Sequence, residues 1–202
     1  MDTELVYFDR EYGVTGWRID NEPKLTWEIS NDGWYVRPSL SIKSTQYQLK
    51  NNSIEVDKTI SRTLPISSID AGLFFERSLT TNTNLIQTFE PRIMYLYAPY
   101  REQSNIPIFD TIEPDMNIIQ LFQKNRFLGI DRIADSNQIN LGFSSKISNN
   151  RTGNELISAT LGKAFYLENQ KVSLPGINNN TESSSDYIAE VRLALINNLN
   201  FN

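Results

Sequence analysis

Polar and apolar residues alternate strictly along most of the chain, and this alternation constrains the fold more than any other feature. Between residues 17 and 30, Trp17 and Ile19 stand at odd positions, whereas Arg18 and Asp20 stand at even ones. Because successive side chains of a strand point to opposite faces, such a pattern puts one face in an apolar medium and the other in a polar one. The pattern therefore predicts an all-β protein.

The same alternation recurs in further stretches, and about eight strands are predicted. They cover approximately residues 5–8, 17–30, 34–43, 62–77, 88–97, 137–147, 157–165 and 187–196. Their lengths suit the roughly 9–11 residues that a tilted membrane strand needs. No helix of normal length is predicted, and only residues 117–123 suggest a single helical turn.

The connections between these strands alternate in length. Short turns are predicted at residues 31–33, 80–84 and 148–154, and long polar connections at residues 50–61, 101–136 and 168–186. This rhythm is typical of an antiparallel up-and-down transmembrane β-barrel. The connection at residues 11–16 is too short for the long-loop side. A soluble sheet with one wet face gives the same alternation, so the pattern alone leaves both folds open.

Aromatic residues gather near both ends of the predicted strands. Trp27 and Trp34 flank a short turn, whereas Tyr95, Tyr97 and Tyr187 lie toward the long loops. Aromatic girdles at the two interfaces of a bilayer have this arrangement. We therefore predict that these five residues face lipid.

The polar faces of the strands would line the lumen of a barrel. Residues two apart on a strand share a face, and the residues predicted to face the lumen are Asp70, Glu76, Gln138, Asn140, Glu190 and Arg192, with Glu90 and Arg92 on the central strand. The alternative is an ordinary hydrated sheet face with weak cross-strand ion pairs.

The connection over residues 101–136 is too apolar for a free loop of its length. From Met94 onward both faces of the preceding strand are apolar, which predicts that this loop covers the strand end. We expect Arg126, Asp131 and Arg132 to tie the loop down through ion pairs and hydrogen bonds.

Composition removes several classes of function. The chain has no His and no Cys, so it lacks the commonest general base, a thiolate nucleophile and Cys-ligated metal sites. The acids Asp110, Glu113, Asp115 and Asp131 of the loop match no EF-hand spacing and accompany no nucleophile–base arrangement. We therefore expect no enzyme activity and no cofactor, and the net charge of −5 argues against nucleic acid as a partner.

The start of the chain is at odds with the barrel pattern. The sequence opens on Met1-Asp2-Thr3-Glu4 and contains no run of about 18 apolar residues. These two facts alone favour a soluble cytoplasmic protein, since a signal peptide is basic and then apolar. The strand pattern opposes that interpretation, and we expect an internal fragment of a longer chain.

The central block of the sequence resembles one family. Residues 88–103 (TFEPRIMYLYAPYREQ), Phe109-Asp110 and residues 121–138 follow the pattern of the outer-membrane lipopolysaccharide-assembly family LptD. Shorter matches occur at Gly16-Trp17-Arg18 and at residues 70–77 and 161–166. The resemblance covers most of the chain.

The resemblance implies a function and partners. It implies insertion of lipopolysaccharide into the outer leaflet of the cell outer membrane, with a plug lipoprotein similar to LptE inside the barrel and periplasmic bridge proteins bound by a separate jellyroll domain. The jellyroll domain, signal peptide and cysteines of the family do not appear in residues 1–202. We therefore expect part of a larger barrel, capped by the loop at about residues 101–136.

Within that barrel, we expect Glu90, Arg92, Arg126, Asp131 and Arg132 to anchor the loop, with contacts to the plug. The alternative functions are a porin-like passive channel and an outer-membrane hydrolase, and the absence of His argues against the triad types of hydrolase.

Overall fold

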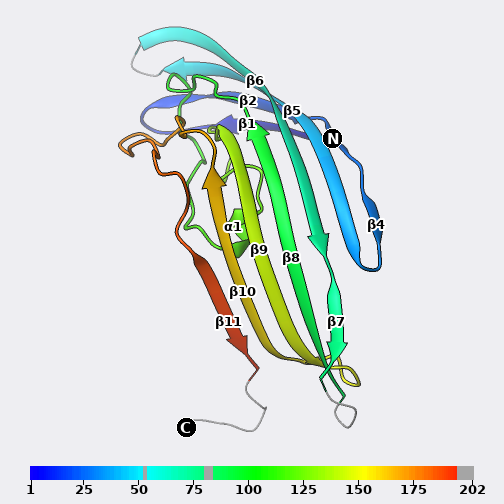
Figure 1. Cartoon of the computed structure of the whole chain (residues 1–202). Helices are drawn as coiled ribbons and strands as arrows, with labels where there is room; N and C mark the ends of the chain where they lie inside the picture. The colour runs from blue at the N-terminus through cyan, green and yellow to red at the C-terminus, as the bar shows by residue number, and fades with distance from the viewer. Residues whose placement is uncertain (52–53, 80–83, 195–202) are drawn as a thin grey trace.

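The computed structural model describes residues 1–51, 54–79 and 84–194 (Figure 1). Its strands form one antiparallel sheet in the order β1-β2-β5-β6-β8-β9-β10-β11, with β3 and β4 paired to β5 and β7 paired to β8. The strands are β1 (Asp2–Phe8), β2 (Val14–Glu22), β3 (Lys24–Thr26), β4 (Ile29–Asn31), β5 (Trp34–Asn51), β6 (Ile54–Leu73), β7 (Phe75–Ser78), β8 (Leu85–Ala98), β9 (Ser136–Asn149), β10 (Glu155–Tyr166) and β11 (Ile188–Leu193).

Several of these strands are pieces of longer ones. β2, β3 and β4 all pair with β5, and Pro23, which has no N–H to donate, separates β2 from β3. β6 and β7, separated by Phe74, both pair with β8. The described residues thus contain eight long strands in up-and-down order, which confirms the predicted all-β fold. The turn predicted at residues 80–84, apart from Asn84, and residues 195–196 of the last predicted strand lie outside the described range.

The sheet is curved and open among the described residues. β1 and β11 stand at its two edges and are not paired with each other. Figure 1 shows the strands bending around the loop that joins β8 to β9, so the sheet has a concave and a convex face. An open, curved, antiparallel sheet of this order is consistent with part of a β-barrel.

The predicted alternation of the faces is confirmed along β5. On the convex face, Trp34, Leu40 and Ile42 are 37%, 51% and 48% exposed, whereas Lys43 and Thr45 on the concave face are 9% and 0% exposed. Over this part of β5 the concave face is therefore covered and the convex face is bare.

The long polar connection predicted over residues 50–61 is wrong. β5 and β6 extend through this range, except for residues 52–53, which lie outside the described part of the chain. Tyr47 and Ile60 are buried on the concave face together with Ile106 of the β8–β9 loop. Tertiary packing on the loop stabilises strands that their own polar composition does not predict.

Short turns join the strands at the opposite end of the sheet. The Asn31 side chain accepts hydrogen bonds from the backbone N–H groups of Gly33 (2.8 Å) and Trp34 (3.0 Å), which closes the predicted turn. Asn149 makes equivalent bonds in the turn between β9 and β10.

The β8–β9 loop contains the predicted single helical turn, α1 (Ile118–Leu121). Asn117 caps it by accepting from the N–H groups of Ile119 and Gln120. The turn lies on two strand positions that carry no side chain, Gly142 of β9 and Gly162 of β10. In the described residues, no helix is long and apolar enough to cross a membrane.

Candidate functional site

The convex face carries an apolar segment of about nine residues on each of three strands, the length that a tilted strand needs to cross a bilayer. The segments run over residues 34–42 of β5, 89–97 of β8 and 157–165 of β10, the last of which also carries one cation, Lys163, on this face. Their midpoints are bare, as at Ile93 (46% exposed) and Leu161 (45% exposed). So large an exposed apolar surface is typical of a face that contacts lipid or another protein.

The apolar segments are displaced from strand to strand. Ser67 of β6 pairs with Leu40 on one side and with Tyr97 on the other, so Tyr97, the last residue of the β8 segment, lies level with Leu40. The β5 segment ends two residues beyond Leu40, at Ile42. Ile139 of β9 likewise pairs with Phe165 and with Tyr95, so Phe165, the last residue of the β10 segment, lies level with Tyr95. The β8 segment ends two residues beyond Tyr95, at Tyr97. The shift is about one residue per strand. With ~3.4 Å per residue and ~4.8 Å between strands, the band is tilted by about 35°, which is the tilt of strands in membrane barrels.

All five aromatic residues predicted to form girdles lie on the convex face. Their exposed fractions are 71% for Trp27, 37% for Trp34, 37% for Tyr95, 39% for Tyr97 and 72% for Tyr187. Phe89 stacks between Phe75 and Phe143 (ring centroids 6.2 Å apart in both pairs), an aromatic row near the short turns that the sequence analysis missed. The contact of the five residues with a bilayer interface stays a prediction.

The β8–β9 loop packs against the concave face at the long-loop end of the sheet. Ile133 is buried with Met94 and Leu96 of β8 and with Leu64 of β6. Phe127 packs against Val172 of the β10–β11 connection. The prediction that the loop covers the end of β8 is therefore confirmed.

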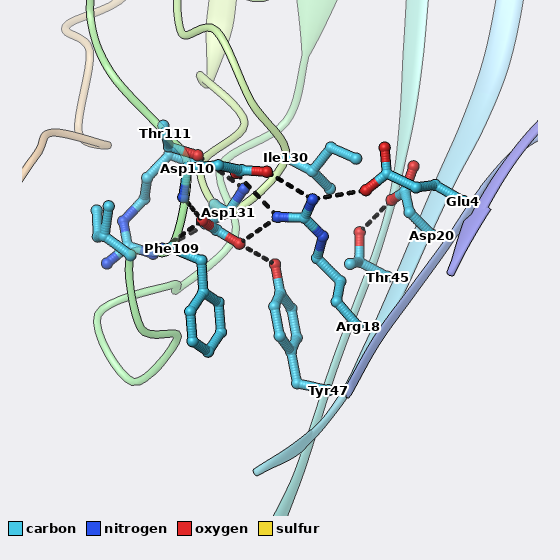
Figure 2. Close-up of polar contacts among 12 residues, drawn as sticks. Glu4, Arg18, Asp20, Thr45, Tyr47, Phe109, Asp110, Thr111, Ile130 and Asp131 are labelled. Atoms are coloured by element: carbon cyan, nitrogen blue, oxygen red, sulfur yellow. Dashed lines mark hydrogen bonds and ion pairs between the residues drawn. The ribbon is translucent and has the colours of Figure 1, made fainter. Parts of the chain in front are cut away.

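Asp131 lies at the centre of the polar contacts between the loop and the sheet (Figure 2). Its Oδ1 accepts from Arg18 Nη1 (2.8 Å) and from the Tyr47 hydroxyl (3.0 Å). Its Oδ2 accepts from the backbone N–H groups of Phe109 (2.7 Å) and Asp110 (3.0 Å). The residue has no exposed surface (0%). Four donors thus satisfy a buried carboxylate that would otherwise be strongly destabilising.

Arg18 of β2 bridges three carboxylates from separate parts of the chain. Besides Asp131, its guanidinium contacts Asp110 of the loop (2.9 and 2.7 Å) and Glu4 of β1 (2.6 Å). The hydrogen bonds from Arg18 hold the pKa of the Asp110 carboxyl below its usual range. The Phe8 ring lies under the same guanidinium, 4.8 Å from its carbon. β1, β2 and the loop are therefore fixed to one another by a single cation.

Arg62 of β6 makes a second connection to the loop. Its Nη1 donates to Gln103 Oε1 (2.7 Å) and to the Asp131 carbonyl (3.0 Å). Its Nη2 donates to the Ile130 carbonyl (2.7 Å) and to Thr45 Oγ1 (2.9 Å). Gln103 also spans the loop itself, since its amide donates to the Ile133 carbonyl (2.8 Å). We call Arg18, Tyr47, Arg62, Gln103 and Asp131, with their partners, the loop clamp.

Of the five predicted loop anchors, three lie in the loop and contact its neighbours. Asp131 is the centre of the loop clamp, and Arg132 Nη1 donates to the Asp131 carbonyl (3.0 Å). Arg126 forms an ion pair with Glu113 (3.0 Å) and donates to the Val172 carbonyl. Their role in anchoring the loop within a working protein stays a proposal.

The other two predicted anchors, Glu90 and Arg92, lie lower on the concave face. Arg92 donates to both carboxylate oxygens of Asp70 (2.8 Å each), and its guanidinium carbon lies 4.0 Å from the centre of the Phe122 ring of the loop. Glu90 accepts from the Thr88 hydroxyl (2.9 Å) on its own strand. Glu90 and Arg92 are thus remote from the loop clamp, and only Arg92 reaches the loop in these contacts.

The predicted lumen-facing residues all belong to the concave side of the sheet, where the loop covers some of them. Asn140 is completely buried and donates to the Leu121 carbonyl (2.5 Å), and Gln138 donates to Asn140 (2.9 Å). Glu190 and Arg192 pair with each other in the open (2.5 Å). Asp70 is bound by Arg92, and Glu76 is exposed. A lumen-lining role in a closed barrel remains a prediction.

The sequence analysis missed four members of the loop clamp, Arg18, Tyr47, Arg62 and Gln103. Arg18 and Gln103 stand in the stretches that carry the family resemblance, which was an available signal. Nothing local to Tyr47 or Arg62 predicts a contact with Asp131, which lies 84 residues from Tyr47 in the sequence.

The arrangement of these acids and arginines suits holding the loop against the sheet. Asp110 and Asp131 both engage Arg18, and Glu113 engages Arg126. In residues 1–51, 54–79 and 84–194, no group of three or more metal-binding side chains could hold an ion.

Comparison with known proteins matches the whole chain, residues 1–202, to the family described as LptD: LPS transport system D. A protein of Nitrosococcus oceani named LPS-assembly protein LptD is 40% identical over 195 residues, covering 95% of this chain and 26% of that protein. Proteins of the same name from Hahella chejuensis and Xanthomonas oryzae are each 35% identical, covering 95% and 96% of this chain and 25% and 24% of their own lengths. The chain therefore spans about a quarter of the length of these curated relatives.

Proposed function

Because the chain belongs to the LptD family, we propose that it forms part of the wall of an outer-membrane barrel that inserts lipopolysaccharide into the outer leaflet. The match over residues 1–202 carries this proposal. The tilted apolar band on the convex face supports a position in the bilayer, because it has the length and tilt of membrane strands. Outer-membrane lipids would then cover that face.

Within this function, the chain supplies two parts. The strands are the wall, and the loop at about residues 101–136 caps the concave side at one end. The polar concave face, with Asp70 and Arg92, offers hydrogen bonds to the saccharide portion of lipopolysaccharide, whereas the acyl chains require an apolar exit to the side. The family match supports the assembly function, and no observation on the described residues favours the porin-like alternative.

The plug lipoprotein similar to LptE is a proposed partner of the concave face. Ile119 of α1 and Phe74 are 65% and 46% exposed beside a cavity of about 450 Å³ that Glu90 and Arg92 also line. Exposed apolar side chains around a polar cavity suit a protein partner. The periplasmic bridge proteins would bind a jellyroll domain outside residues 1–202.

Crosslinking tests the plug contact. A photoreactive amino acid at Ile119 should crosslink to the plug lipoprotein in cells, whereas the same residue at Ile93 on the convex face should not. Equal crosslinking from both positions, or none from Ile119, would contradict the assignment of the concave face to the plug.

Complementation tests the function. Cells depleted of the natural protein that carries this chain should show less lipopolysaccharide at the surface, measured by antibody binding, and should take up more hydrophobic dye. Wild-type protein should restore both, and Asp131→Asn should restore them only partly, because it removes the charge at the centre of the loop clamp. Asp186→Asn, in an exposed loop, is the matched control. Normal surface lipopolysaccharide after depletion, with ion conductance by the purified protein without a plug, would instead favour a passive channel.

A further inference from the structure

A second polar site lies at the long-loop end of the sheet, outside the loop clamp. A cavity of about 410 Å³ opens between the start of the β8–β9 loop and the β10–β11 connection. Its lining includes three cations, Arg101, Arg132 and Lys171, together with Tyr100 and the single acid Glu102. A cavity of this volume has room for a small ligand. Three cations in one cavity are notable in a chain whose net charge is −5.

The acids near this cavity are already occupied. Glu102 accepts from the backbone N–H groups of Gln103 (2.9 Å) and Ser104 (2.8 Å) and from the Tyr100 hydroxyl (2.7 Å). The hydrogen bond from the Ser104 backbone is the main reason that the pKa of Glu102 falls to about 2. Asp135 likewise accepts from the backbone N–H groups of Lys171 (2.8 Å) and Val172 (2.9 Å). These carboxylates hold the backbone in place and form no ion pair with the three cations, and the cavity lining, with three cations and one acid, stays net positive.

The three cations are, by contrast, free to bind a ligand. None of them forms an ion pair with any residue that the structure describes. Arg132 is 4% exposed, and its hydrogen bond within the described part of the chain is from Nη1 to the Asp131 carbonyl, so Nε and Nη2 have no such partner. Lys171 lies over the Tyr100 ring (5.6 Å), and Arg101 makes one long contact, to the Thr63 carbonyl (3.5 Å).

From this geometry we propose that the cavity binds a phosphate group. A guanidinium fork held in place by burial, with a second guanidinium and an ammonium around it, is the arrangement that recognises phosphate oxygens. Tyr100 adds a ring of the kind on which sugars and other apolar faces can rest. The phosphate site does not depend on the proposed function. The proposed function is needed only to identify the phosphate as part of a phosphorylated glycolipid.

The test measures binding of inorganic phosphate by calorimetry to the natural protein that carries this chain, purified in detergent at low ionic strength. Arg101→Gln and Lys171→Gln alter exposed side chains and should leave the fold intact. Each should weaken phosphate binding about five- to tenfold, since a charge-assisted hydrogen bond is lost. Arg151→Gln, in the exposed turn at the other end of the sheet, is the matched control and should leave binding unchanged.

Arg132→Lys separates geometry from charge, because it keeps the cation and removes the fork. Arg132→Lys should weaken phosphate binding. Because Arg132 is buried, a loss could also come from altered packing, and the exposed Lys171→Gln tests the site without changing the protein interior. Phosphate affinity that is equal in wild-type protein and in the Arg101→Gln/Lys171→Gln double variant would overturn the proposal.

A second arm identifies the source of the phosphate. Binding of intact and of enzymatically dephosphorylated lipopolysaccharide is compared at the same lipid concentration. A preference for the intact form that the double variant loses supports the site and assigns the phosphate to the glycolipid. Binding of inorganic phosphate without that preference supports the site and assigns it to a free anion. Because calorimetry with inorganic phosphate needs no transport, this test can succeed or fail independently of the depletion experiment.

Discussion

At the scale of single residues, Gly129 is the most restrictive position of the loop. Its φ is +86°, and an added Cβ would lie 2.7 Å from the Asp110 carbonyl oxygen and 2.9 Å from the Thr111 Cα. These are backbone atoms beside the loop clamp, so they cannot move aside cheaply. Gly129→Ala should therefore destabilise the protein by about 2–3 kcal/mol, combining backbone strain with the clash.

Gly153 provides the matched control for that substitution. Its φ is +72°, and an added Cβ would meet nothing within 4 Å. Gly153→Ala should cost about 1 kcal/mol, from strain alone. Denaturant unfolding of the two variants in detergent compares them directly, and equal losses would show that the contact with residues 110 and 111 does not constrain the loop.

Asp110 gives the loop a predictable dependence on pH. Hydrogen bonds from Arg18 lower its folded-state pKa, so the unfolded state binds the proton more readily. The stabilisation is complete above the unfolded value of ~3.9 and is lost as the pH falls through the lower folded value. Protection of residues 101–136 from hydrogen exchange, corrected for intrinsic rates, should thus begin to fall as the pH drops below about 4 and should continue to fall through the lower folded value.

The carboxylates of Glu4 and Asp131 also form ion pairs with Arg18, so Asp110 is one of three acids that hold this cation. Asp110→Asn should flatten the pH profile of protection without abolishing it, whereas Asp115→Asn, in an exposed part of the same loop, should leave the profile unchanged. An identical profile in Asp110→Asn and wild-type protein would show that Asp110 does not contribute.

The sequence predicts a residue of the loop clamp only where the residue's own neighbours in the sequence indicate its role. Asp131 could be selected because a charged residue in an apolar loop needs a partner. Its partner Arg18 lies 113 residues away, and no local pattern distinguishes it from cations on other polar strand faces, such as Lys43. Alternation reveals the face on which a side chain lies and not the group that it contacts.

At the scale of elements, α1 depends on two glycines beneath it. A Cβ at Gly162 would lie 2.5 Å from Leu121 Cδ2 and 2.9 Å from Ile118 Cδ1. These are ends of flexible side chains, so the helical turn should move and the protein should still fold. Gly162→Val should cost about 1–3 kcal/mol through overpacking and should increase hydrogen exchange in residues 117–122.

Ala159→Val is the control, because Ala159 lies on the exposed convex face of the same strand. It should leave exchange at α1 unchanged. Equal exchange at α1 in both variants would mean that the helical turn does not rest on Gly162.

The error over residues 50–61 also belongs to this scale. Asn, Ser and Lys in that range indicate a loop, and the apolar residues among them are too few for a strand with one buried face. The strands form because Ile106 of the β8–β9 loop covers Tyr47 and Ile60. The partner that decides the structure comes from another element, so a window-by-window interpretation could not include it.

At the scale of the whole molecule, the convex apolar band makes a prediction about depth in the bilayer. Leu40, Ser67, Tyr97 and Asn137 form one row across β5, β6, β8 and β9. If the strands stood upright, all four would lie at one depth. A tilt of about 35° should instead place position 40 about 8 Å deeper than position 137, given ~4.8 Å between strands.

Residues 1–202 contain no Cys, so once any cysteines elsewhere in the natural protein are replaced by Ser, a single cysteine introduced here gives a unique site for a nitroxide label. Labels are placed at positions 40, 67, 97 and 137 of the protein in lipid vesicles. The ratio of accessibility to oxygen over accessibility to a water-soluble relaxant should decline steadily from position 40 to position 137. A label at the exposed Gln48, beyond the end of the β5 segment, should report water and calibrates that limit. Uniform depth along the row would refute the tilt, and a row accessible only to the water-soluble relaxant would place the convex face outside the bilayer altogether.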